Sequence, residues 1–297
     1  MKGVFPFHFI KSFTLALFLA GGGFSPLRGG QESFETDADY SFVGGARMQN
    51  GAGEGTVSEQ SNLLRCVLSS EVDGGSLIRT GVEWQRYSFS SAPSSLMMPN
   101  TLQSLSLVLG VDTDICGWLI RIEAQPGFYG DFNDSAGKCF NVPFIVGGSY
   151  LMGEDLQWVV GVSVNVERNL PVLPAAGVRW KFADHWVADA VLPRPRFEYL
   201  LNNSTTLYTG GDFKLGTYRM GSDFGTEHNQ NSLNNAIVNY TEIRVGCGVE
   251  VKASSSVKID FETGCMVYRQ FDYDRANTTV GNDTGGAYGQ IIVNLSF

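Results

Sequence analysis

Apolar and polar residues alternate through most of this chain, and that alternation restricts the fold more than any other feature. Segment 257–262 is the most regular case, with the order Val257, Lys258, Ile259, Asp260, Phe261 and Glu262. The same alternation recurs in 77–89, 116–128, 156–167 and 241–252. Because successive side chains of a strand point to opposite faces, each segment predicts a strand with one apolar and one polar face. We therefore expect an all-β protein.

Two all-β architectures contain strands of this kind, a soluble sandwich and a membrane-spanning barrel. Several predicted strands are longer than the roughly 5–6 residues usual in globular sheets and suit a tilted bilayer crossing of about 9–11 residues. Connections near the carboxy terminus are short at 252–256, and long and polar at 221–234 and 273–286. Barrels in membranes alternate short turns with long loops in this way. We favour a single transmembrane antiparallel up-and-down β-barrel.

The strand count follows less directly from the sequence. The alternating segments are 36–47, 59–71, 76–90, 100–112, 116–130, 139–151, 156–167, 172–182, 186–200, 205–220, 235–251, 256–272 and 287–297. Bacterial single-chain barrels have an even number of strands, so an odd set contains an error. The two doubtful segments are 36–47, which can lie outside the barrel, and 186–200, which contains Pro193 and Pro195. We expect about 12 strands, with 10 or 14 as alternatives.

Composition excludes several classes of function. Charged residues make up 17% of the chain, below the ~25% of soluble domains, as expected when polar side chains occupy only one face. The net charge of −9, without a basic cluster, argues against a nucleic-acid partner. No cysteine and histidine spacing typical of a metal site is present. We predict neither a metal nor a cofactor.

The amino terminus predicts an export signal. Lys2 and Lys11 supply positive charge, and the apolar stretch 13–20 is shorter than the ~20 residues of a membrane-spanning helix. We expect a signal peptide over 1–30, cleaved between 20 and 30, with an uncleaved anchor as the alternative. Residues 31–58 then form either a first strand or a periplasmic stretch, and 59–297 form the barrel.

The last predicted strand, 287–297, ends on an aromatic residue, Phe297. It resembles the final strand of bacterial outer-membrane β-barrels, in which this ending serves as the assembly signal. The resemblance implies the outer membrane of a Gram-negative bacterium as the location. It also implies outer-membrane lipid and the barrel assembly machinery, which would recognise the carboxy-terminal strand, as partners.

Motifs in the middle of the chain carry a second resemblance. Proline, tryptophan and tyrosine recur near predicted strand ends in 170–180, 192–199, 207–213 and 217–219. The series is similar to a family of uncharacterised bacterial outer-membrane β-barrel proteins, most densely over 156–220 and more broadly from about 60 to 297. The family has no assigned substrate or catalytic residues, so the resemblance implies architecture and location only.

Charged side chains on the polar faces support the main functional hypothesis. Ten of them, of both signs, are candidate lumen-lining residues: Arg79, Glu83, Arg121, Glu123, Arg179, Arg244, Glu250, Lys258, Asp260 and Glu262. They form either a salt-bridged, packed interior or the lining of a water-filled path, depending on barrel radius and inserted loops. The first hypothesis is a passive, porin-like channel or transport-related barrel for small polar solutes. The alternative is a structural or surface-interaction barrel with a filled lumen, in which loops 221–234 and 273–286 contact partners.

A barrel hydrolase is a third hypothesis. It requires a serine or acid beside a histidine, and only His185 and His228 follow the predicted signal peptide. His185 lies in a predicted turn and His228 in a polar loop. We therefore predict no catalytic residues and no enzymatic activity, unless either histidine bonds to a serine or an aspartate.

The five cysteines are not expected to form a disulfide framework. Strand parity places Cys66, Cys116, Cys247 and Cys265 on apolar faces, where they act as small apolar residues. The role of Cys139 is left open.

Overall fold

The structure is a computed structural model that describes residues 32–72, 75–132 and 136–297. The predicted signal peptide lies outside the described residues. The strands are β1 (Glu32–Gln49), β2 (Glu54–Val72), β3 (Ser76–Phe89), β4 (Thr101–Ile115), β5 (Trp118–Ala124), β6 (Gly127–Gly130), β7 (Phe140–Asn141), β8 (Phe144–Met152), β9 (Leu156–Val164), β10 (Val172–Ala183), β11 (Trp186–Asp189), β12 (Arg196–Leu200), β13 (Thr205–Arg219), β14 (Ile237–Lys252), β15 (Val257–Tyr273), β16 (Thr278–Asn282) and β17 (Gly286–Ser296).

Helical structure is confined to the connections. The helix α1 (Phe224–Glu227) is accompanied by the 3-10 turns η1 (Ser94–Leu96), η2 (Ala136–Cys139), η3 (Asn231–Leu233) and η4 (Asp274–Ala276). Within the described ranges, none of the helices has the length and apolar character needed to span a membrane.

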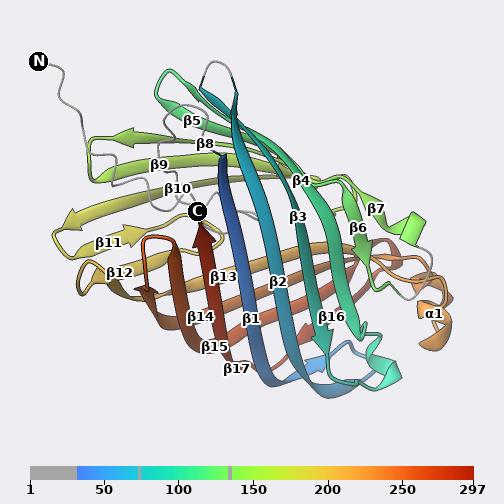
Figure 1. The fold of residues 1–297 in the computed structure, drawn as a ribbon. Coiled ribbons are helices and arrows are strands. Elements are labelled where there is room, and N and C mark those ends of the chain that lie inside the picture. Colours follow the sequence, from blue (N-terminus) through green and yellow to red (C-terminus); the bar gives the residue numbers. More distant parts are fainter. Residues whose placement is uncertain (1–31, 73–74, 133–135) are drawn as a thin grey trace, which may run out of the picture.

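The strands form one closed antiparallel barrel. The ring closes because β1 pairs with β2 along one edge and with β17 along the other, and Figure 1 shows these first and last strands side by side. Three positions in the ring are each shared by two consecutive strands, namely β5 with β6, β7 with β8, and β16 with β17. The described strands therefore occupy fourteen positions.

The expected count of about 12 strands is corrected to fourteen. The prolines of segment 186–200 explain the difference. The doubtful segment 186–200 is not one strand too many but two strands, β11 and β12, joined by residues 190–195. Neither Pro193 nor Pro195 has an N–H to donate, but both carbonyl oxygens accept from β13, from Phe213 and Gly211 respectively. The other doubtful segment, 36–47, lies within β1 and is part of the ring.

The connections differ at the two ends of the barrel. At the end that contains the carboxy terminus they are short, namely 116–117, 153–155, 184–185, 201–204 and 253–256; we call this the short-turn end. At the opposite, long-loop end they include 90–100, 165–171 and 220–236. The expected loop at 221–234 is present. The expected loop at 273–286 is wrong, because η4 and β16 fill most of it and β16 pairs with β15.

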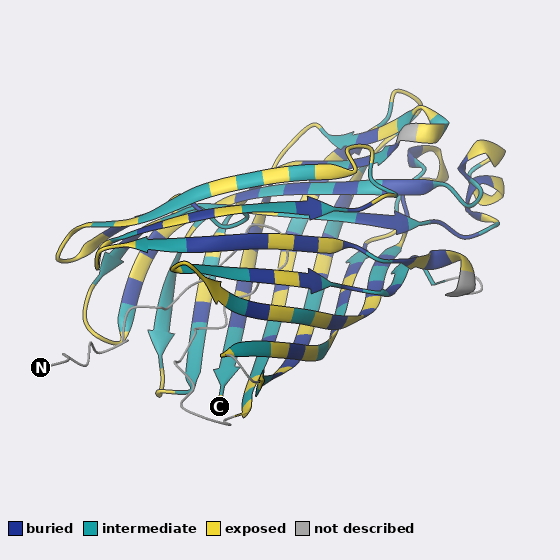
Figure 2. Cartoon of the chain, turned by 90° about the horizontal axis from the view of Figure 1, so that it is seen from above, coloured by how far each residue is buried: buried dark blue, intermediate teal, exposed yellow. Residues whose placement is uncertain are grey.

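The apolar faces of the strands point outward. Along β4, Leu105, Leu107 and Leu109 are about half exposed, whereas the intervening Ser104 and Ser106 are buried. Figure 2 shows this alternation of buried and exposed positions along many strands. Val160 and Val245, which a sandwich would pack between two sheets, are likewise exposed. The sandwich alternative therefore does not describe this protein.

Candidate functional site: the barrel interior

Each of the ten predicted lumen residues has an ion-pair partner in the structure. Nearest the short-turn end, Arg179 lies 2.5 Å from Asp189 and 2.8 Å from Glu198. Lys258 lies 3.2 Å from Glu250 at the same end. The interior of a barrel holds these charges because strand parity alternates them with the outward apolar residues.

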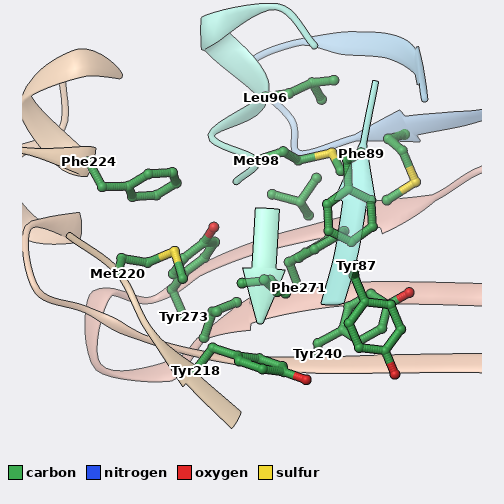
Figure 3. Close-up of a cluster of buried hydrophobic side chains, with 14 of the residues drawn as sticks. Tyr87, Phe89, Leu96, Met98, Tyr218, Met220, Phe224, Tyr240, Phe271 and Tyr273 are labelled. Atoms are coloured by element: carbon green, nitrogen blue, oxygen red, sulfur yellow. The ribbon is translucent and has the colours of Figure 1, made fainter. Parts of the chain in front are cut away.

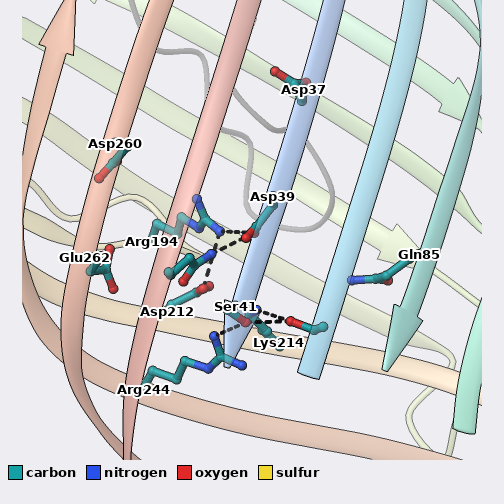
Figure 4. A network of polar contacts seen from close by, with 12 residues as sticks. Asp37, Asp39, Ser41, Gln85, Arg194, Asp212, Lys214, Arg244, Asp260 and Glu262 are labelled. Carbon is teal, nitrogen blue, oxygen red and sulfur yellow. Dashed lines mark hydrogen bonds and ion pairs between the residues drawn. The ribbon is translucent and has the colours of Figure 1, made fainter. Parts of the chain in front are cut away.

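A second set of charges lies at mid-height and centres on two arginines. Arg194, in the connection between β11 and β12, lies 3.2 Å from Asp39 and 3.4 Å from Asp212. Figure 4 shows Arg194 in contact with both carboxylates, which come from β1 and β13. Arg196 lies 2.9 Å from Asp260 and 3.5 Å from Glu262, and its guanidinium stacks on the ring of Tyr208.

The wall formed by β1 to β5 carries the remaining predicted charges. Its ion pairs, all nearly inaccessible to solvent, are Arg65 with Glu83 and Glu123, Arg79 with Glu35 and Asp112, and Arg121 with Asp112.

Nearer the long-loop end, four charges are completely buried. Arg244 lies 3.0 Å from Glu59, and Arg269 lies 2.6 Å from Glu242; each arginine also contacts the other carboxylate. The Tyr240 hydroxyl lies 2.7 Å from Glu59 and 2.8 Å from Glu242. We call these five residues the ionic seal. Two arginines and two glutamates make it formally neutral.

An apolar cluster fills the barrel beyond the ionic seal. Figure 3 shows it at the long-loop end, built from strand ends and from two loops. We call it the apolar plug; its buried members are Met48, Val57, Tyr87, Phe89, Leu96, Met98, Leu102, Tyr218, Met220, Phe224, Leu233, Val238, Tyr240, Phe271, Tyr273 and Val280. Tyr240 joins the plug to the seal, since its ring packs 4.9 Å from that of Tyr87.

Solvent reaches some inward charges on the short-turn side of the ionic seal but does not reach the seal itself. The side chains of Arg179, Arg194 and Lys258 are 22%, 24% and 29% exposed, whereas Arg244 and Arg269 are 0% exposed. Beside the wall of β3 to β5, a cavity of about 20 Å³ lies near Tyr129 and Leu215, room for about one water molecule. A larger hollow, of about 690 Å³, lies mostly against outward-facing residues of β13 to β17, and its lining also includes the inward-facing Tyr208, Glu262 and Gln290.

Sequence reasoning missed several residues of this interior. Parity along the strand could have found Arg65, since it alternates with the outward Leu64 and Cys66. Glu59 lies between polar residues, and an irregularity at Val267 reverses the parity before Arg269. Arg194 follows no alternation, because it lies in the proline-rich connection. The apolar plug gives no sequence signal of its own, since its aromatic residues occupy inward positions that elsewhere carry charges.

Neither histidine has the surroundings of a catalytic base. The Nδ1 atom of His185 lies 2.8 Å from the carbonyl oxygen of Leu200, and that of His228 lies 2.7 Å from the carbonyl oxygen of Phe224. Within the described residues, neither hydrogen-bonds to a serine or an aspartate, so the geometry gives the hydrolase hypothesis no support. The same residues contain no group of three or more histidine, cysteine, aspartate or glutamate side chains that could hold a metal ion.

The cysteines are free thiols in the structure. Cys247 and Cys265 are exposed on outward faces and Cys66 is partly exposed, in agreement with their expected parity. Cys116 is a correction, because it lies in the turn between β4 and β5 rather than on a strand face. Cys139 is buried in η2, and the sulfur lies close to Gly130.

Comparison with known proteins adds a family but no activity. A family described as a domain of unknown function (DUF6268) matches residues 91–280, which include the proline and tryptophan motifs at 170–219. No curated protein matches the chain.

The solved structures to which the chain is similar include outer-membrane channels. They include the TodX monoaromatic hydrocarbon channel as a deltaS2 mutant, with a TM-score of 0.48, 9% identity and 92% of each chain covered. An outer membrane channel from Pseudomonas putida F1 has a TM-score of 0.47 and 10% identity, over 99% of this chain and 100% of that one. The Pseudomonas putida toluene transporter TodX has a TM-score of 0.44 and 10% identity, over 89% of each chain. We transfer no substrate or mechanism at these values.

Proposed function

Because the chain belongs to the DUF6268 family, whose description assigns no activity, we propose a function from the barrel itself. The protein is a transport-related barrel of the bacterial outer membrane. It admits small polar solutes from its short-turn end and is held shut at its long-loop end.

The outward face supports the membrane location. Leucine, valine, isoleucine and phenylalanine side chains are exposed on strands around the ring, and such a continuous apolar surface is unfavourable in water. A closed barrel satisfies its backbone hydrogen bonds between strands, which is the requirement for crossing a bilayer without helices. In outer-membrane barrels short turns face the periplasm, so the short-turn end is the periplasmic end in this proposal.

The difference in exposure along the lumen is the single observation that supports a conduit best. Arg179, Arg194 and Lys258, at the short-turn end and at mid-height, are partly solvated, whereas the charges of the ionic seal are not. Polar solutes small enough to enter therefore have a path to Arg194 and are stopped beyond it.

The apolar plug is formed partly by loops, which makes it a candidate gate. Loop 90–100 contributes Leu96 and Met98 to the apolar plug, and loop 220–236 contributes Phe224 and Leu233. Loops can move without breaking the strand pairing of the ring, and gating elements are commonly loops of this kind. Displacing both loops would remove part of the plug and leave the barrel closed as a ring.

Conductance across planar bilayers tests the proposal. We expect few and brief openings from the wild type, and more frequent openings from Leu96→Asn and Leu233→Asn, because each places an amide in the apolar plug. Leu201→Asn, in an exposed short turn, is the matched control and is expected to behave as the wild type. Circular dichroism would confirm that each variant keeps its strands.

If the plug variants fold but conduct at no voltage, that result would instead support the second function. That function is a structural or surface-interaction barrel with a filled lumen. The tightly packed plug and the fully buried ionic seal favour it specifically. In that case loop 220–236, which carries α1 and η3, is the surface that would contact partners.

A further inference from the structure

The lumen on the short-turn side of the ionic seal carries more carboxylates than cations. We propose that it selects cationic solutes over anionic ones. This proposal rests on the conduit function, since it assigns a solute class to the same path.

A count of the inward charges of β1 and of β10 to β17 on the short-turn side of the seal, all within the described residues, shows the imbalance. Seven cations are present, Arg179, Lys181, Arg194, Arg196, Lys214, Lys252 and Lys258. Nine carboxylates accompany them, Glu35, Asp37, Asp39, Asp189, Glu198, Asp212, Glu250, Asp260 and Glu262. The formal charge of this set is therefore −2. The neutral ionic seal does not offset it.

The excess arises because three arginines each face two carboxylates. Arg179, Arg194 and Arg196 are each placed between a pair of acids, so every such group carries a net negative charge. Asp37 adds another, since it accepts a hydrogen bond from the Asn294 amide at 2.7 Å and forms no ion pair within the described residues. In Figure 4, Asp37, Asp39, Asp260 and Glu262 border the space around Arg194.

A second observation concerns acceptor oxygens that lack donors. The Gln290 amide donates from Nε2 to Asp39 Oδ2 at 2.7 Å, which fixes the orientation of the amide. Its own Oε1 is buried and has no hydrogen-bond partner among the described residues, and the same holds for Asp39 Oδ1. Gln290 is only 4% exposed. Two neighbouring residues thus present unpaired acceptors, which a cation satisfies and an anion does not.

The electrostatic consequence is a path that favours one sign of charge. Carboxylates along a narrow lumen with low-dielectric walls concentrate cations and repel anions, as rings of acidic side chains do in cation channels. Lys214 lies at the inner limit of the path, where its Nζ is 3.5 Å from the Ser61 hydroxyl. The proposal therefore predicts enrichment of cations up to mid-height even when the plug is shut.

Cysteine modification tests the proposal without requiring conduction. In a background with the native cysteines replaced, Asn294→Cys places a thiol beside Asp37, and cationic and anionic methanethiosulfonates of similar size are compared. The control is a protein that keeps only Cys116, which is exposed in a turn at the same end. We expect the ratio of cationic to anionic rates to be about 10-fold higher at Asn294→Cys than at Cys116. Equal ratios, or faster reaction with the anionic reagent, would overturn the proposal.

Reversal potentials in a potassium chloride gradient separate this proposal from the conduit function. In Leu96→Asn we expect potassium to permeate in preference to chloride, and Asp39→Asn with Asp212→Asn to reduce that preference. Asp184→Asn, exposed in a short turn, is the matched control. Conductance without cation preference contradicts this proposal alone. Absence of conductance contradicts the conduit, and the modification rates then still decide whether the lumen prefers cations.

Discussion

Individual buried arginines show how the interior tolerates so many charges. Arg244 is fully inaccessible, yet its guanidinium contacts Glu59, Glu242 and the Ser41 hydroxyl and lies over the Tyr288 ring. Removing two charges from water is costly, so such a pair persists only with close geometry and additional hydrogen bonds. Removing Arg244 leaves Glu59 and Glu242 to share Arg269, so one buried negative charge is no longer compensated.

The first prediction compares a buried and an exposed arginine. Arg244→Met is expected to lower the free energy of unfolding by about 3–5 kcal/mol, because Glu59 and Glu242 lose a counter-charge. Arg47→Met, whose ion pair with Asp283 is about half exposed, is expected to cost less than about 1 kcal/mol. Urea unfolding in lipid vesicles measures both values. Similar losses for the two variants would contradict the role assigned to the ionic seal.

At the scale of elements, one two-residue turn of the barrel departs from ideal turn chemistry. Residues 116–117 join β4 and β5, and both have positive φ, 55° at Cys116 and 82° at Gly117. Two-residue hairpin turns of this kind favour asparagine followed by glycine, because side chains other than asparagine and aspartate are strained at positive φ. Cys116 therefore occupies a position that suits asparagine better.

The second prediction follows from that turn. Cys116→Asn is expected to raise the free energy of unfolding by up to about 1 kcal/mol by relieving backbone strain. Gly117→Ala is expected to lower the free energy of unfolding by about 1–2 kcal/mol, because a residue with a Cβ is strained at the φ of 82° found at this position. Thermal unfolding in detergent ranks the two variants against the wild type. A stabilising effect of Gly117→Ala would show that the turn has another conformation.

At the scale of the whole molecule, the ring closes beside its last residue. Phe297 exchanges two backbone hydrogen bonds with Phe34, of 3.0 and 2.9 Å, while its side chain is 66% exposed. The backbone therefore takes part in closing the barrel, and the side chain contributes little packing. The role of that side chain as an assembly signal stays a prediction.

The third prediction separates assembly from stability. Phe297→Ala keeps the backbone hydrogen bonds, so refolded protein in detergent is expected to match the wild type within about 0.5 kcal/mol. If the assembly machinery recognises the phenyl ring of Phe297, the amount of folded Phe297→Ala barrel in cell membranes falls severalfold. Phe140→Ala, another exposed aromatic on a strand, is the control. Unchanged membrane levels for Phe297→Ala would show that the side chain is not the signal.

Local pattern in the sequence determined the class of fold and the direction of each face. The alternation at Val257 to Glu262 placed Lys258 and Asp260 inward and Phe261 outward, because parity in a strand is fixed by covalent geometry. Parity also placed Cys247 and Cys265 correctly. It failed at Cys116 and in 186–200, where a turn and two prolines interrupt the strand.

Only the tertiary structure decided what fills the barrel. The sequence left open whether the charged lumen was packed or water-filled; packing joins Glu59 to Arg244 and Asp39 to Arg194, residues separated by 185 and 155 positions. It also brings the loops that carry Leu96 and Leu233 together over the long-loop end. A strand pattern specifies which way a side chain points, but curvature of the closed ring determines which other side chain it meets there.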